Sequence, residues 1–194
     1  MTTSKIIAIS GSLRADSHNT LLLRAAQKFD PGSAEIEIYD GLREIPPYDQ
    51  DLDNPEQRPA VVNDLRRRVL EADGLLIATP EFNYSIPGAL KNAIDWLSTD
   101  FTGTEGQPLS RKPTAVMGAA PTNFGSVRAQ LALRQVFVWT ESDIVVKPEV
   151  VVFRSHERFD AEGNLTDETT IALLQDLLTA LHRKIAVARA ARVG

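Results

Sequence analysis

Short apolar runs alternate with longer stretches of helical period along the chain. Residues 5–10 form such a run, and in residues 19–29 leucines, alanines and a phenylalanine fall on one helical stripe. Isoleucines alternate with glutamates in residues 34–39, which predicts a half-exposed strand at or near a sheet edge. We expect further strands at 74–79, 114–118 and 144–153 (interrupted at 147–149), a Pro-rich loop at 41–59, and helices at 61–69, 87–97, 126–138 and 171–185.

Strands that alternate with helices predict a parallel sheet with helices on both faces, because each crossover returns to the sheet with a right-handed turn. Five such units favour the flavodoxin-like strand order 2-1-3-4-5, an α/β/α sandwich of three layers with a five-stranded parallel sheet. The length suits one domain spanning residues 1–194. Ligands of such sheets bind beyond the carboxyl ends of strands 1 and 3, where the loops at 10–20 and 80–85 are expected.

The composition limits the classes of function. Hydrophobic residues make up 43% of the chain and charged residues 24%, and no apolar stretch approaches the roughly 18 residues of a membrane span. Residues 1–5 lack a basic region followed by an apolar core, so we expect no secretory signal and a cytoplasmic protein. The absence of cysteine excludes thiolate metal sites and thiol redox chemistry, and the three histidines show no metal-ligand spacing.

The charge pattern does not favour nucleic acid as a partner. The formal net charge is -5, and the one basic run, residues 66–68, lies within an amphipathic pattern. We therefore interpret this run as a solvated helix face rather than a nucleic-acid patch.

The loop at residues 10–20, SGSLRADSHNT, is rich in hydrogen-bond donors. A loop between a strand and a helix N-terminus can bind an anion, because free backbone N–H groups and the helix dipole point toward it. Its single glycine fits neither the dinucleotide nor the triphosphate fingerprint. Several hydroxyls and one arginine suit a terminal monophosphate such as that of FMN, whereas the alternative is that these residues only form turns and cap the helix. The candidate donors are Ser10, Ser12, Arg14, Ser17, Asn19 and Thr20.

A second loop, within residues 80–96 (PEFNYSIPGALKNAIDW), follows the predicted strand at 74–79. Together with the motif Gly11-Ser12-Leu13-Arg14-x-x-Ser17-x-Asn19, this segment resembles the NADPH-dependent FMN reductase family. That family comprises flavodoxin-like flavoenzymes, among them quinone, chromate and azo-dye reductases. Weaker matches at residues 46–49, 128–135 and 147–149 extend the resemblance over nearly the whole chain.

The resemblance implies where FMN binds. It places the FMN phosphate on Ser12, Arg14, Ser17, Asn19 and Thr20. It places the ribityl chain and the edge of the isoalloxazine ring on Pro80, Glu81, Phe82, Asn83, Tyr84 and Ser85, with backbone amides of this loop meeting flavin O4 and N5. The family more often has tyrosine at position 82, and we expect the loss of its hydroxyl to have little effect on flavin binding.

The loop after the fourth predicted strand departs from the family pattern G-A-S-x-G-x-x-G-G-x-R, because residues 118–128 read GAAPTNFGSVR. In the family this loop lies along the flavin, so the resemblance makes Ala119 and Ala120 candidate cofactor-binding residues. Pro121 and Phe124 are bulky, which leaves the flavin contacts of this loop open. The connection at 103–111 is longer than usual and is a candidate for altering the rim of the pocket.

The function implied by the resemblance is that of an FMN-dependent NAD(P)H oxidoreductase with a ping-pong mechanism. NADPH or NADH gives hydride to FMN and leaves, and a quinone, flavin, dye or metal oxyanion then takes the electrons in the same cleft. The protein mainly orients these groups, so we assign no catalytic acid or base and no metal ligand.

Other classes of function remain as alternatives. A non-enzymatic flavodoxin-like electron carrier is disfavoured by the modest charge and the 6% aromatic content, whereas a flavin-binding regulator stays open. A serine hydrolase is disfavoured because the G-x-S-x-G elbow is absent.

Five single residues receive separate interpretations. We expect Glu81 to accept hydrogen bonds from backbone N–H groups rather than to act as an acid or base. Tyr48, Tyr84 and Phe124 are candidates for lining an acceptor pocket, although aromatic residues in loops also cover sheet edges. His18 is expected to be exposed to solvent.

The apolar helix that follows the second loop ends in Trp96 and Leu97, which suits either a subunit interface or the core. The resemblance implies a homodimer or homotetramer with the flavin cleft near the interface.

Overall fold

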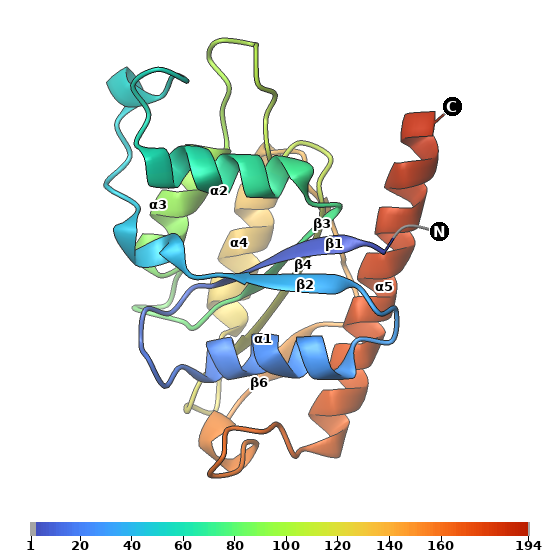
Figure 1. Cartoon of the computed structure of the whole chain (residues 1–194). Helices are drawn as coiled ribbons and strands as arrows, with labels where there is room; N and C mark the ends of the chain where they lie inside the picture. The colour runs from blue at the N-terminus through green and yellow to red at the C-terminus, as the bar shows by residue number, and fades with distance from the viewer. Residues whose placement is uncertain (1–2, 194) are drawn as a thin grey trace.

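A parallel sheet forms the centre of the computed structural model, which describes residues 3–193 (Figure 1). Met1 and Thr2, the start of the segment in which we expect no secretory signal, lie outside the described residues. The strand order β2-β1-β3-β4-β5 confirms the predicted topology, and β6 also pairs with β4. The strands are β1 Lys5–Ser10, β2 Glu35–Tyr39, β3 Gly74–Ala78, β4 Pro113–Ala119, β5 Asp143–Ile144 and β6 Val150–Val152.

The predicted fifth strand is split in two. β5 lies beside the start of β4, where Pro113 is opposite Asp143, and β6 lies beside its end, where Ala119 is opposite Val152. The predicted interruption at 147–149 falls between these two short strands. Among the described strands, β2 pairs with β1 alone, as its half-exposed pattern predicted.

Helices cover both faces of the sheet. α1 and α5 pack on one face and α2, α3 and α4 on the other, and Figure 1 shows α2 above and α1 below the β1–β2 strands. The alternation of side chains along each strand fills both cores, since Ile6 and Ala8 of β1 face α1 and α5 while Ile7 and Ile9 face the other layer. The α-helices are α1 His18–Phe29, α2 Ala60–Glu71, α3 Gly88–Leu97, α4 Val127–Trp139 and α5 Glu168–Val193, and the short 3-10 helices are η1 Gly41–Glu44, η2 Gln50–Leu52 and η3 Ser155–Glu157.

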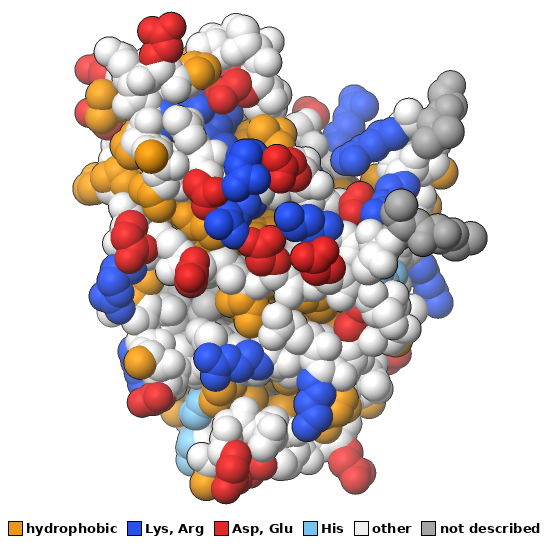
Figure 2. Space-filling model, viewed as in Figure 1, with side chains coloured by type: hydrophobic (Ala, Val, Ile, Leu, Met, Phe, Trp, Pro, Cys, Tyr) orange, Lys and Arg blue, Asp and Glu red, His pale blue; other side chains and the backbone are white. Residues whose placement is uncertain are grey.

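The basic run at 66–68 is only partly the solvated face that we predicted. Arg67 and Arg68 form ion pairs, for example with Asp64, and Figure 2 shows acidic and basic side chains interleaved over α2 and β2. Arg66, however, is 2% exposed and donates hydrogen bonds to the backbone oxygens of Trp96 and Thr99 at 2.7 and 2.9 Å. One arginine of the run therefore belongs to the interior.

Trp96 and Leu97 lie in the core rather than on a surface. Both are at most 1% exposed in the layer formed by α2, α3 and α4, and the indole Nε1 of Trp96 donates to the backbone oxygen of Pro46 at 2.9 Å. The residues available for an interface must therefore be found elsewhere. Within residues 3–193, no helix has the length and apolar character needed to cross a membrane.

Candidate functional site

A cleft of about 610 Å³ opens where the loops after β1, β3 and β4 meet the segment that follows β6. These loops converge because parallel strands place their carboxyl ends at one edge of the sheet. Eleven of the thirteen residues predicted to bind the cofactor line the cleft: Ser12, Arg14, Ser17, Asn19, Pro80, Glu81, Phe82, Asn83, Tyr84, Ala119 and Ala120.

The first loop presents donors at the start of α1. Ser17 caps this helix, since its hydroxyl accepts a hydrogen bond from the backbone N–H of Asn19 at 3.2 Å. Arg14 is exposed and forms no ion pair with any residue of the described chain. The loop therefore brings a helix N-terminus, hydroxyl groups and one uncompensated positive charge to the same end of the cleft.

Asn19 connects this loop to the wall of the cleft. Its buried side-chain amide donates to the backbone oxygen of Ala119 and accepts from the backbone N–H of the same residue, both at 2.9 Å. Both ends of the amide are thereby engaged within the protein. The geometry indicates that the side chain holds α1 against the end of β4.

Thr20 and Ser85 do not line the cleft. The Thr20 hydroxyl donates to the Ser10 hydroxyl at 3.0 Å and faces a neighbouring cavity of about 290 Å³. Ser85 pairs its backbone with Phe82 in both directions, at 3.0 and 3.1 Å. This pairing closes the tight turn in which Asn83 and Tyr84 have positive φ angles of 51° and 67°.

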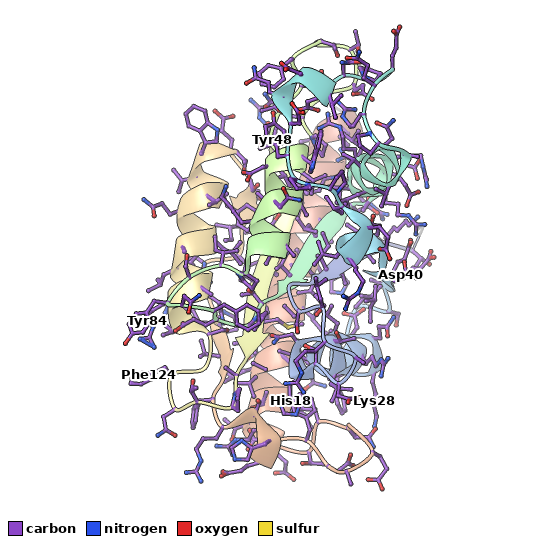
Figure 3. The ribbon with its side chains drawn as sticks, turned by 90° about the vertical axis from the view of Figure 1, so that its left-hand side faces the viewer. His18, Lys28, Asp40, Tyr48, Tyr84 and Phe124 are labelled. Atoms are coloured by element: carbon purple, nitrogen blue, oxygen red, sulfur yellow. The ribbon has the colours of Figure 1, made fainter. Side chains whose placement is uncertain are left out.

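Glu81 and Arg128 join the second loop to the start of α4. The Glu81 carboxylate accepts from the Arg128 backbone N–H at 2.9 Å and from its Nε at 2.7 Å, which confirms Glu81 as an acceptor for a backbone N–H. The Arg128 guanidinium lies 3.8 Å from the ring centroid of Tyr84 and 4.8 Å from that of Phe124. Figure 3 shows Tyr84 and Phe124 near each other at one side of the molecule.

The loop after β4 forms one wall of the cleft despite its departure from the family pattern. Residues outside this loop hold its backbone in place. The Ala120 N–H donates to the backbone oxygen of Val152 at 3.0 Å, and the Ala120 backbone oxygen accepts from the Ser155 N–H at 3.1 Å. Gly118, next to the last residue of β4, permits the close approach of this strand to Thr79 after β3, since a Cβ there would lie 2.2 Å from the Thr79 carbonyl oxygen.

Two candidates for the surroundings of the cleft lie elsewhere in the structure, and a third expectation is wrong. Tyr48 lies well above Tyr84 in Figure 3, away from the cleft, and packs edge-on against Trp96 with ring centroids 4.9 Å apart. Residues 103–111 contribute nothing to the rim of the cleft and lie over the buried Arg58 and Arg66 instead. The third concerns His18.

His18 is half-buried and lines the cleft. Its Nδ1 lies 2.6 Å from Ser155 Oγ, and its ring stacks on Phe159 with centroids 5.2 Å apart. Burial, followed by the positive charges of Arg14 and His156, lowers the pKa of the His18 imidazole.

Sequence reasoning also missed Arg128 and Ser155 as residues of the cleft. Arg128 had a signal, because it lies in a segment matched to the family. Ser155 had none, since it follows β6 and reaches the cleft only through the folded arrangement.

Comparison with known proteins bears on what this cleft binds. The sequence model of the family described as NADPH-dependent FMN reductase matches residues 4–157. The chain belongs to the NADPH-dependent FMN reductase family. This membership confirms the predicted oxidoreductase class, FMN as the cofactor and a reduced nicotinamide as the electron donor.

Relatives of this family cover nearly the whole chain. An NAD(P)H-dependent FMN reductase of Pseudomonas aeruginosa is 42% identical over 92% of this chain and 93% of its own length. A quinone reductase of Escherichia coli is 37% identical over 91% of this chain and 92% of its own length. The solved structure of FerB, a flavoenzyme NAD(P)H:(acceptor) oxidoreductase from Paracoccus denitrificans, has a TM-score of 0.84 at 32% identity and covers 95% of this chain and 98% of its own.

The residues of the cleft fit the cofactor of the FMN reductase family. The volume of the cleft lies within the range of about 300 to 1,000 Å³ that is usual for small-molecule sites. Among the described residues that line it, Glu81 is the only carboxylate, and Arg128 neutralises it. The end near Arg14 therefore favours an anionic phosphate, and the aromatic end near Tyr84 suits a planar ring.

Proposed function

We propose that the protein passes electrons from NADPH or NADH through FMN to a quinone-type acceptor by a ping-pong mechanism. The observation that supports this most is that the same cleft combines a cationic end rich in hydroxyls with an open aromatic end. One open site suits two planar substrates that bind in turn. The quinone reductases among the relatives of this chain favour a quinone as the acceptor, whereas free flavins, dyes and metal oxyanions are further candidates.

FMN, when bound, supplies a ring that accepts hydride and then gives up electrons. The hydroxyls of Ser12 and Ser17 and the guanidinium of Arg14 bind its phosphate under this proposal. The residues from Pro80 to Tyr84 bind the ribityl chain and the ring edge, and Ala119 and Ala120 form the wall beside it. Thr20 and Ser85 support these contacts from outside the cleft.

The open end admits the substrates. Phe82, Tyr84 and Phe124 are 52%, 73% and 62% exposed, and all three line the cleft. Exposed aromatic side chains offer flat apolar surfaces against which a planar ring can pack. Glu81, the one carboxylate among the described residues of the lining, is paired with Arg128, which agrees with a role in orienting reactants rather than in acid-base catalysis.

Anaerobic spectroscopy of the FMN-loaded protein tests this proposal. We expect NADPH or NADH to bleach the bound flavin without another protein, and a quinone added afterwards to restore the oxidised spectrum. Steady-state rates at several quinone concentrations should give parallel double-reciprocal lines. Free FMN at the same concentration is the control. Binding without bleaching would favour the electron carrier or the regulator, and intersecting lines would refute the ping-pong order.

We also propose that the protein self-associates, as a homodimer or homotetramer, through the outer face of α4. Leu131, Val138 and Trp139 are 56%, 78% and 82% exposed, and their spacing of seven and eight residues places them on one side of the helix. α4 begins at the rim of the cleft, so a second copy on this face would lie close to the cofactor. Light scattering should give a multiple of 21.3 kDa, and the monomer mass at micromolar concentration would refute self-association.

We propose the cytoplasm as the location of the protein, because its electron donor is a reduced nicotinamide. Cell fractionation tests this, and recovery of the protein outside the cytoplasmic fraction would contradict it.

A further inference from the structure

The contacts of the His18 ring could not be predicted from the sequence. His18 is the first residue of α1, yet its ring contacts Ser155 and Phe159 from the segment between β6 and α5. Ser155 is fully buried, and both His18 and Ser155 line the cleft. Figure 3 shows His18 toward the same end of the molecule as Phe124 and away from Tyr48. An exposed surface histidine would have neither a buried partner nor a stacked ring.

The charges that reach the His18 ring are positive. Arg14 acts from the loop after β1, and His156 acts from η3. Two acidic groups lie near these charges: Glu157 is paired with Arg154 and lies 3.6 Å from His156, and Asp16, which forms no ion pair in the described chain, is two residues from His18 in the sequence. The charges that act on the ring itself are nevertheless those of Arg14 and His156, so protonation of His18 in the protein without cofactor would add a positive charge beside two others.

We propose that His18 is a ligand of the FMN phosphate that takes up a proton when the cofactor binds. A phosphate at the start of α1 carries about -1.5 to -2 charges near neutral pH, which would reverse the sign of the local field. The imidazolium then donates from Nδ1 to Ser155 Oγ, the proton comes from solvent, and Phe159 keeps the ring in place. The affinity for FMN must then increase as the pH falls.

This inference rests on the proposed placement of the phosphate at the start of α1. It adds a residue that the family motif of hydroxyls and arginine does not contain. It also assigns a role to the segment 155–159, of which only Ser155 lines the cleft. The contact across 137 residues of sequence would couple that segment to cofactor binding.

Titration of the protein with FMN at several pH values tests the proposal. A nearby opposite charge raises a histidine pKa by about 1 to 3 units, so we expect FMN to bind about tenfold more tightly near pH 6.5 than near pH 8.5. In His18→Gln the difference in FMN affinity between these two pH values should be less than about twofold. The part that remains comes from the second ionisation of the FMN phosphate, which has a pKa near 6. His182→Gln is the matched control and should keep the wild-type dependence, because His182 contacts Asp30 at 2.6 Å, does not line the cleft and does not act on the His18 ring.

Two further measurements separate the proposal from its alternatives. Riboflavin lacks the phosphate, so its affinity should not follow the titration of His18. In the wild-type protein, NMR titration of the His18 imidazole should show a higher pKa with FMN than without it, and this readout does not depend on any variant being folded. An unchanged His18 titration, or an undiminished pH dependence in His18→Gln, would overturn the proposal. A wild-type protein that binds no FMN at any pH would refute the cofactor site itself.

Discussion

Replacing Asn19 by alanine distinguishes a structural role for this side chain from a role in binding phosphate. The substitution removes two hydrogen bonds of 2.9 Å and leaves the N–H and C=O groups of Ala119 without their partner at a site that is 2% exposed. Each buried polar group left unpaired costs about 1 to 3 kcal/mol, which gives about 2 to 6 kcal/mol for the pair. Water entering from the cleft would compensate part of this, so we expect a loss of at least about 2 kcal/mol.

Urea unfolding of the cofactor-free protein, followed by circular dichroism, measures this loss as a shift of the midpoint at constant slope. Gln27→Ala is the matched control, because Gln27 lies in the same helix and its amide makes a single hydrogen bond, of 2.7 Å, to the backbone oxygen of Ile36. We expect about 0.5 to 1.5 kcal/mol for this control. Unchanged stability of Asn19→Ala combined with weaker FMN binding would refute the structural role and assign the amide to the phosphate.

Three further predictions concern binding, folding and pH dependence. Ser12→Ala should weaken FMN binding by about 1 to 3 kcal/mol, and an unchanged affinity in a fluorescence titration would remove Ser12 from the phosphate site. Gly118→Ala should prevent normal folding, since the new Cβ would lie 2.0 Å from Ser126 Oγ and 2.2 Å from the Thr79 carbonyl oxygen. The serine hydroxyl can rotate away, but the backbone carbonyl cannot. A circular dichroism spectrum and a melting temperature equal to those of the wild type would contradict this. Burial lowers the pKa of Lys112 to about 8, so above that pH the folded state binds fewer protons than the unfolded state and its stability rises with pH. Between pH 8 and 9.5, the free energy of unfolding of the wild type should therefore increase by about 2 kcal/mol relative to that of Lys112→Met. Urea unfolding at several pH values measures this, and a constant difference between the two proteins would contradict it.

The sheet and its helices could be predicted because their sequence signals are local. β1 and β3 are buried on both faces and read as continuous apolar runs, whereas β2 pairs on one side only and alternates. Each helix carries an apolar stripe that identifies its buried face. The strand order then follows from the number of β-α units and the handedness of their crossovers.

Side-chain partners far apart in the sequence could not be predicted in the same way. His18 and Arg66 both occur where a polar pattern suggests solvent, yet each finds a hydrogen-bond partner in a segment at least 30 residues away. Tyr48 occurs in a loop like Tyr84, but it packs against Trp96 far from the cleft. A periodic pattern gives the face on which a residue lies, while the partner on that face depends on how the layers pack.

The connections around the cleft indicate that its walls are held in place by the protein itself. Asn19 fixes α1 to Ala119, Glu81 fixes the second loop to Arg128, and Ser155 N–H fixes η3 to Ala120. Each connection joins two segments that are far apart in the sequence, so the positions of the phosphate end and of the ring end depend on each other. A preorganised site loses less conformational entropy when it binds a ligand. The loop after β4 can therefore depart from the family pattern, with Ala120, Thr122 and Ser126 at positions where the pattern has serine or glycine, because Asn19 and β6 hold its backbone through Ala119 and Ala120.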